Sequence, residues 1–314
     1  MSHLVETMCY SGETPWHGLG IKVPPDLSVP EILLKAGLDW TVKKSPTFYE
    51  VNDGRKETGK FALYRESDGQ FLSNVTDTWN PCQNSEAFEI FHEFVEGSEL
   101  EMHTAGSLKD GQIVWGLAKM KESFSLFKGK DVTEQYLLLV NPHQHGQGIH
   151  VRSTPIRVVC NNTLSFSLGQ HSDVKATQNH RSKFDVESMK ACIGIAKEKL
   201  VVYQEQAELI SKKRYTEDSV KGYFNTIFPN TTTKKESKDE PSRNAKKAFE
   251  ILHTQPGAKY GAGSWWQAYN SVTFLADHVI GRNDDTRLHS TWFGPNKERK
   301  ILALNEAVRM SQAA

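Results

Sequence analysis

The stretch TPIRVVCNNTL, residues 154–164, places residue types that bind anions directly beside a strand-like run. Asn161, Asn162 and Thr163 are residue types that begin helices, so we expect a helix to start here. The free N–H groups at a helix start, together with the positive end of the helix dipole, bind phosphate readily. Strict β-alternation would put Arg157 and the preceding Arg152 on opposite faces, but Pro155 between them favours an edge or bulge that could bring them together. Helix capping alone is the alternative explanation for the polar residues. The candidate anion-binding residues are Arg152, Arg157, Asn161, Asn162 and Thr163.

A second group near the C-terminus alternates cations with aromatic rings. Cations that follow phosphates and rings that stack on bases are what a single nucleic-acid strand needs. The candidate nucleic-acid contacts here are Arg282, Arg287, Trp292 and Lys297. The alternative is a buried aromatic helix followed by a solvated charged loop.

Three histidines within NPHQHGQGIHV could ligate zinc, which needs imidazole nitrogens converging on one point. They are His143, His145 and His150. Pro142, Gly146 and Gly148 indicate a turn, and no fourth ligand lies nearby, so we expect a polar hairpin loop without metal.

Enzyme signatures are missing from the sequence. Cys160 could be a nucleophile if a helix dipole lowered its pKa, but a small buried cysteine is the simpler interpretation. Phosphate-loop, dinucleotide, serine-hydrolase and zinc-protease patterns are all absent. We therefore expect a binding protein without a cofactor rather than an enzyme.

Composition describes an ordinary globular chain. The 314 residues contain 38 Lys+Arg and 38 Asp+Glu, so nucleic-acid binding would depend on local clusters of charge. No apolar run approaches the roughly 18 residues that span a membrane. Four widely spaced cysteines and a polar N-terminus lead us to expect a reducing cytoplasm.

The elements that position these residues fall into two halves. Short aromatic and β-branched runs are separated by Asp-Gly pairs at 53–54, 68–69 and 110–111, a pattern typical of β-hairpins, and residues 84–97 have helical spacing. Residues 1–184 are therefore predicted to form a β-rich α+β region. Its mainly antiparallel sheet is followed by a helical C-terminal half at 185–314.

The helical half begins with the clearest periodicity in the chain. Apolar residues from Met189 to Ile210 alternate steps of four and three, which predicts a long helix. The seam would pack on the β-region or against a second subunit. A polar, proline-bounded segment at 229–242 predicts a mobile loop, with helices resuming near 243–253, 264–280 and 297–310.

Several of these motifs occur in the same order in a known family. They are TPWHGLG (14–20), GLDW (37–40), HTAGSLKDGQIVW (103–115), YLLLVN (136–141), TPIRVVCNNTL (154–164), WWQAYNSVTFLADH (265–278) and WFG with a following lysine (292–297). The chain resembles the phage/plasmid-like proteins grouped as a domain of unknown function. The resemblance covers nearly the whole chain and implies a mobile genetic element in a bacterial cytoplasm.

We expect the chain to bind single-stranded DNA, as an annealing or recombination protein that forms a homo-oligomer. A counter-defence protein that blocks a host complex is the alternative, because the helical seam could serve as its interaction surface. A DNA-processing enzyme is the third hypothesis, although no cluster of carboxylates supports it.

Overall fold

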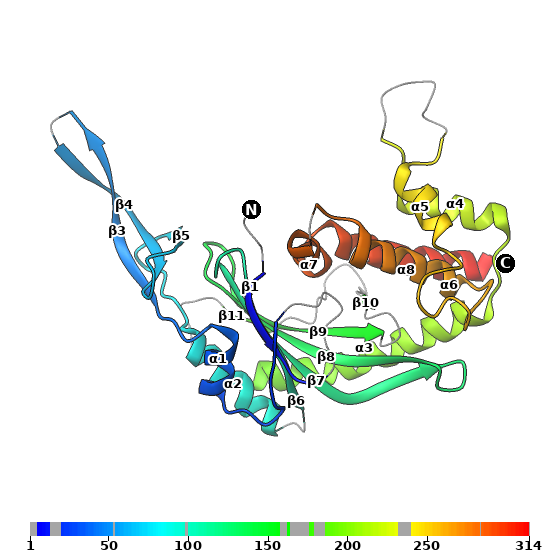
Figure 1. Cartoon of the computed structure of the whole chain (residues 1–314), viewed down its shortest axis with the longest axis horizontal. Helices are drawn as coiled ribbons and strands as arrows, with labels where there is room; N and C mark the ends of the chain where they lie inside the picture. Colours follow the sequence, from blue (N-terminus) through cyan, green and yellow to red (C-terminus); the bar gives the residue numbers. More distant parts are fainter. Residues whose placement is uncertain are drawn as a thin grey trace. The chain divides into compact units, whose positions relative to one another are not determined.

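The computed structural model describes residues 5–12, 20–52, 54–97, 100–157, 162–163, 176–178, 186–231, 240–282 and 284–313. The chain divides into two compact units, each described by itself below. The first unit comprises residues 1–121, 136–153 and 173–196, and the second comprises 122–135, 154–172 and 197–314. The predicted α+β class is confirmed, with an antiparallel-rich sheet in the N-terminal half and helices in the C-terminal half (Figure 1).

The larger sheet has the strand order β10-β9-β8-β7-β6-β1-β2, and β11 also pairs with β9. Its strands are β1 Val5–Tyr10, β2 Ile21–Lys22, β6 Glu101–Leu108, β7 Ile113–Leu126, β8 Asp131–Pro142, β9 Ile149–Arg157, β10 Asn162–Thr163 and β11 Ala176–Gln178. Neighbouring pairs β1–β6 and β6–β7 are antiparallel, whereas β1–β2 is parallel. The long strands β7 and β8 contribute their outer ends, residues 122–135, to the second unit.

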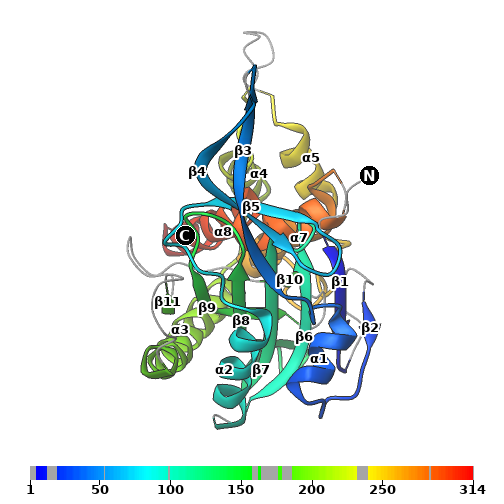
Figure 2. The ribbon, with the colours of Figure 1, turned by 90° about the vertical axis from the view of Figure 1, so that its left-hand side faces the viewer.

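A smaller sheet in the first unit has the order β3-β4-β5. Its strands are β3 Val42–Val51, β4 Gly54–Arg65 and β5 Phe71–Val75. The β3–β4 ribbon extends beyond β5 in both views of the chain (Figures 1 and 2). Hairpin turns predicted at 68–69 and 110–111 are confirmed, and Gly69 and Gly111 adopt positive φ values of 74° and 85° there.

Besides the start of α3 (Val186–Lys212), the first unit contains two helices, α1 Val29–Ala36 and α2 Asn84–Gly97. They pack on each other and on β6, and the predicted helix at 84–97 is confirmed. The core below them contains Trp40, Phe88, Phe91 and Leu139, all of which are buried. The core also includes Ile149 and Val151, so it anchors strand β9, on which Arg152 lies.

The second unit is helical. Its elements are α3 Val186–Lys212 (from Lys197 onward), α4 Glu217–Ile227, α5 Arg243–Glu250, α6 Trp265–Phe274, the π-helix η2 Leu275–Val279, α7 Asp284–Phe293 and α8 Pro295–Ala313. The predicted long helix is confirmed as α3, and helices were also predicted at the positions of α5, α6 and α8. Most of the predicted loop at 229–242 lies outside the described residues.

Two local expectations are wrong. Asn162 and Thr163 do not start a helix, because they form β10 and pair antiparallel with Arg157 and Ile156 of β9. Residues 284 and 285 belong to the segment for which a solvated charged loop was the alternative, yet they begin α7, which packs against α8 and η2. In both places contacts between elements outweigh the preference of the local sequence.

Among the described residues, no helix is both long and apolar enough to cross a lipid bilayer.

Candidate nucleic-acid interface

The strand-borne part of the predicted site is only partly described. Asn161 and Cys160 lie outside the described residues, and for Arg157, Asn162 and Thr163 the backbone alone is described. The backbone of β10 lies beside α6 within the second unit. Two motifs far apart in the sequence therefore meet, but the helix end that was expected to bind phosphate is replaced by an antiparallel strand pair.

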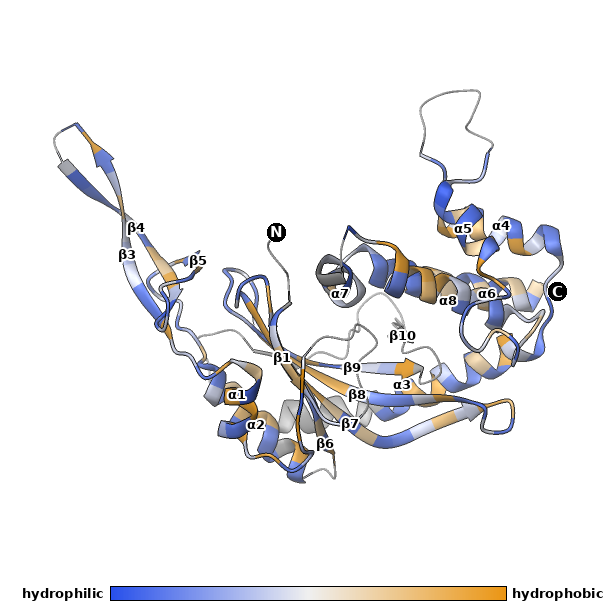
Figure 3. Ribbon diagram, in the orientation of Figure 1, coloured by the Kyte–Doolittle hydropathy of each residue, from blue (hydrophilic) through white to orange (hydrophobic). Residues whose placement is uncertain are grey.

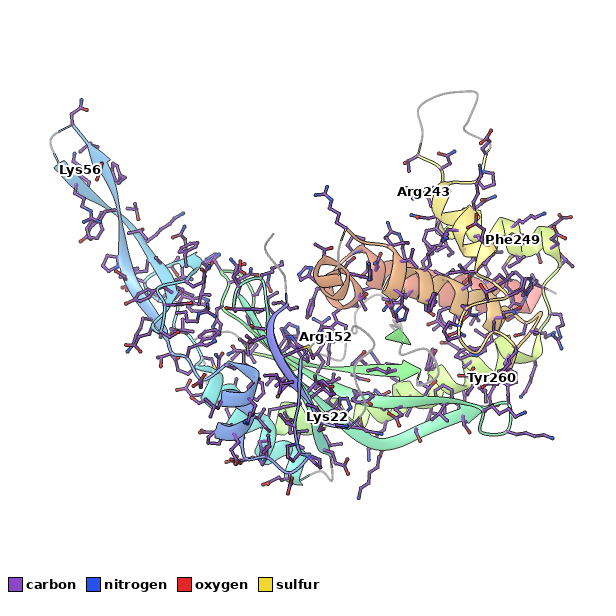
Figure 4. All side chains as sticks on the ribbon, in the orientation of Figure 1. Lys22, Lys56, Arg152, Arg243, Phe249 and Tyr260 are labelled. Atoms are coloured by element: carbon purple, nitrogen blue, oxygen red, sulfur yellow. The ribbon has the colours of Figure 1, made fainter. Side chains whose placement is uncertain are left out.

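Arg152 is engaged with a histidine on its own strand. Its Nη2 lies 2.5 Å from His150 Nε2, and His150 Nδ1 lies 2.9 Å from the carbonyl oxygen of Gly148. Since arginine only donates, Nε2 must accept and Nδ1 must carry the proton. The half-buried Arg152 (labelled in Figure 4) therefore holds the imidazole ring of His150 in one tautomer.

The other two histidines have different surroundings. His143 is buried, and its Nε2 donates to Asn84 Oδ1 at 3.0 Å, while His145 is exposed in the β8–β9 connection. Asn84 in turn donates to the carbonyl oxygen of Leu38 at 3.0 Å, so this contact joins α2 to the segment that follows α1. Within the part of the chain that the structure describes, no three His, Cys, Asp or Glu side chains are placed to hold a metal ion.

The two cysteines with described side chains lack the features of an activated nucleophile. Burial raises the pKa of Cys9 to about 11, because its thiolate would be poorly solvated. Burial and the neighbouring charge of Glu86 raise the pKa of Cys82 to about 12. Both thiols stay protonated at neutral pH, and the protonated form is a poor nucleophile.

The C-terminal candidates separate into exposed and enclosed residues. Arg282 is exposed, whereas Arg287 and Lys297 are half-buried. Trp292 is 8% exposed, and its ring packs edge-on against Phe293 at a centroid distance of 6.1 Å. The ring of Trp292 belongs to the interior of the second unit, so its predicted stacking on a base is wrong for this conformation.

A groove of about 720 Å³ lies beside α5 in the second unit. Its lining residues are Arg243, Asn244, Lys246, Lys247, Glu250, Val279, Ile280 and Gly281. Arg282 follows the last lining residue directly in the chain. Figure 4 labels Arg243 at the first turn of α5, and Figure 3 shows that this helix is strongly hydrophilic on one side.

Local sequence fixes the α5 wall of the groove. Ser242 caps the helix, since its Oγ accepts from the Ala245 N–H at 3.1 Å and donates to the carbonyl oxygen of Phe228 at 2.7 Å. Ala245 and Ala248 are buried, and Ser271 of α6 donates to the Ala248 carbonyl oxygen at 2.5 Å. With this side of α5 held inward, its cations are left on the outer side.

A π-helical turn forms the opposite wall. The Ile280 N–H donates to the carbonyl oxygen of Leu275 at 2.8 Å, which closes the wider turn of η2. Asn296 donates to the carbonyl oxygens of Ala276 and Ile280 at 2.6 and 3.1 Å, so α8 holds the end of η2. Val279 remains 40% exposed beside this wall.

The cations of the groove are weakly neutralised. Lys246 lies 3.5 Å from Glu240 and Lys247 lies 3.5 Å from Glu250, and all four side chains are largely exposed. Exposed pairs of this length contribute little and are screened by salt. Arg243 and Arg282 have no carboxylate partner among the residues that are described. The groove can therefore accept phosphate groups without breaking a strong ion pair.

The sequence contained a signal for this groove, but the balanced number of acidic and basic residues drew attention away from this local cluster of cations. In SRNAKKAF, a serine cap is followed by cations at positions 243, 246 and 247, the spacing that places residues on one helix face. Of the residues predicted from the sequence, only Arg282 lies next to the groove. The groove itself could not be predicted, because its second wall, residues 279–281, comes from a different segment of the chain than α5.

A family model described as "Domain of unknown function (DUF932)" matches residues 71–292, which run from β5 through almost all of α7. The chain belongs to this family. The match includes both walls of the α5 groove, and it begins after β3 and β4. The predicted resemblance is confirmed at the level of a family of unknown function. No curated protein and no solved structure matches the chain.

Proposed function

We propose that the chain binds single-stranded DNA and that the α5 groove holds its phosphate backbone. The observation that carries the proposal is the convergence of Arg243, Lys246 and Lys247 on one groove, with Arg282 next to its opposite wall. Lys and Arg contacts to phosphate are independent of base sequence and supply most of the affinity of non-specific binding. The exposed Val279 gives the groove an apolar part that a sugar or base could cover.

The resemblance to phage/plasmid-like proteins supports a setting for this activity. In that setting the chain acts in annealing or recombination of mobile-element DNA within the bacterial cytoplasm, and assembles as a homo-oligomer on the strand. The helical seam is not part of the proposed contact. Leu200, Tyr203 and Ile210 are buried in the second unit against residues that include Phe124 and Trp265.

The first prediction concerns the two arginines of the groove. The double variant Arg243→Ala/Arg282→Ala should weaken binding of a labelled single strand by about tenfold per arginine, since each removes a charged hydrogen-bond donor to phosphate. Fluorescence anisotropy at low salt measures the effect. Both side chains are exposed, so circular dichroism should show an unchanged fold.

A matched control is Lys213→Ala. Lys213 is an exposed cation of the same unit that does not line the groove. Its loss changes net charge by one without removing a groove contact, so affinity should change little. Equal weakening by the control, or full affinity in the double variant, would contradict the placement of DNA in this groove.

A further inference from the structure

The β3–β5 sheet carries a face whose chemistry differs from that of its opposite face. Directly opposed residues of antiparallel strands point to the same side, and successive residues alternate. Tyr49 is opposed by Lys56, Lys43 by Tyr64, and Tyr64 by Phe71. The register shifts between Pro46 and Phe48 and between Leu63 and Tyr64, but Lys43 and Tyr49 are separated by an even number of positions on β3. These residues, Lys43, Tyr49, Lys56, Tyr64 and Phe71, define the lysine–aromatic face.

The opposite face is occupied by contacts within the first unit. Val42, opposed by Arg65, and Leu63, opposed by Lys44, lie there, and both apolar side chains are buried in its core. Farther out, the Arg55 guanidinium lies 4.4 Å from the centroid of the Phe48 ring. The acidic residues Glu50 and Glu57 lie on this side as well, since they are opposed by Arg55 and Phe48.

Charge therefore differs between the two faces. The residues that define the lysine–aromatic face include no acid, and only Lys43 has a carboxylate nearby, that of Glu66 at 3.5 Å. Lys56 has no ion pair among the described residues and lies near the outer end of the ribbon (Figure 4). A ligand on this face would meet unneutralised positive charge in the outer half, which favours an anion.

Large aromatic rings on this face are open to water. Tyr49 is 50% exposed and Phe71 is 47% exposed. No described element of the first unit lies beside the outer half of the ribbon in either view (Figures 1 and 2). Exposed rings without a covering element forgo the free energy that burial of apolar area supplies, so a planar ligand would be stabilised on them.

We propose that the lysine–aromatic face is a second contact for single-stranded nucleic acid, in which Tyr49 and Phe71 stack on bases and Lys56 binds a phosphate. The inference rests on the proposed function for the class of ligand, but it uses different residues in a different unit. Stacking needs unpaired bases with free faces, which a duplex does not offer along its length. The face therefore adds a preference for single strands to the charge-based attraction of the α5 groove.

The test uses the full chain and variants on both faces of the ribbon. Tyr49→Ala/Phe71→Ala should lower affinity for a labelled single strand by about tenfold or more, because stacking on an aromatic ring contributes substantially for each base. Affinity for a duplex of the same sequence should change little. Lys56→Ala should reduce the slope of log affinity against log salt by about 0.7, as loss of one phosphate contact requires.

Phe48→Ala and Arg55→Ala are the matched controls, because they remove an aromatic ring and a cation from the opposite face of the same ribbon. Binding lost only in the lysine–aromatic variants supports the inference. Equal losses from both faces, or full affinity in Tyr49→Ala/Phe71→Ala, overturn it.

The groove variants separate this inference from the proposed function. If Arg243→Ala/Arg282→Ala loses binding while the lysine–aromatic variants keep it, the sheet contact alone is overturned. If the unmodified chain binds no single strand at low salt, the proposed function fails and the sheet contact fails with it.

Discussion

At the scale of single residues, the most demanding arrangement is a buried ion pair behind the groove. Lys300 and Asp277 are both fully buried, with Nζ and Oδ1 separated by 2.9 Å. Thr291 donates to the same Oδ1 at 3.1 Å. Burial lowers the pKa of Lys300, and the Asp277 charge offsets part of that effect. Because Asp277 belongs to η2, the ion pair connects α8 to one wall of the groove, and the Thr291 hydrogen bond connects α7 to it.

Removing the cation from this pair should be costly. Lys300→Ala removes the buried ammonium group that neutralises Asp277, and we expect it to lower the free energy of unfolding by about 3–5 kcal/mol. Arg309→Ala is the matched control, since Arg309 lies on the same helix and pairs with Glu306 at 2.6 Å but is exposed. Urea unfolding followed by circular dichroism should show a much smaller change for the control. Comparable stability of both variants would show that the pair is not closed in solution.

A site residue could be predicted from the sequence only where the neighbouring residues indicated that its side chain would be exposed to solvent. Arg282 lies between polar residues and is exposed as expected, because nothing in its segment could bury it. Trp292 was assigned to the same surface, yet helix formation at 284–293 places its ring inside. Arg243 was overlooked, because the significance of its charge depends on a wall supplied by residues 279–281.

At the scale of elements, a buried hydrogen bond joins the outer end of the β7–β8 hairpin to α6. Trp266 Nε1 donates to Asp131 Oδ2 at 2.8 Å. Trp266→Phe removes this donor to a buried carboxylate. Trp265→Phe serves as control, because Trp265 is equally buried and its Nε1 has no partner among the described residues.

The Trp266→Phe variant should lose roughly 1.5–3 kcal/mol more of its unfolding free energy than the Trp265→Phe variant, which is what a hydrogen bond to a charged group contributes. Chemical denaturation of the two variants in parallel gives the difference. Equal losses would mean that the hydrogen bond does not stabilise the second unit.

Helices and turns were predicted correctly where residues close together in the sequence determine them. The Asp-Gly turns at 68–69 and 110–111 and the long apolar repeat of α3 are local, and they were predicted correctly. The strand β10 and the helix α7 were not, because each depends on contacts with another element that its own residues do not reveal: β10 pairs with β9, and α7 packs against α8 and η2. Which side chains share a face of the β3–β4 ribbon also could not be predicted, because the answer depends on the register between the two strands.

At the scale of the whole molecule, a chain with 38 basic and 38 acidic residues has no net charge to attract nucleic acid. Attraction must then come from local clusters, and each unit offers one: the α5 groove in the second and the lysine–aromatic face in the first. In the proposed mode of binding, the groove would supply phosphate contacts and the sheet would supply rings for bases. Such a division would give affinity that depends on salt and selectivity that depends on unpaired bases.

The salt dependence of single-strand affinity tests the central claim most directly. Up to four cations at the groove and one on the sheet could contact phosphates, so log affinity should fall against log salt with a slope of about −2 to −3.5. In Arg243→Ala/Arg282→Ala the slope should become shallower by about 1.4, from two lost phosphate contacts. Absence of binding at low salt, or a slope that the double variant leaves unchanged, would contradict the assignment of the α5 groove to single-stranded DNA.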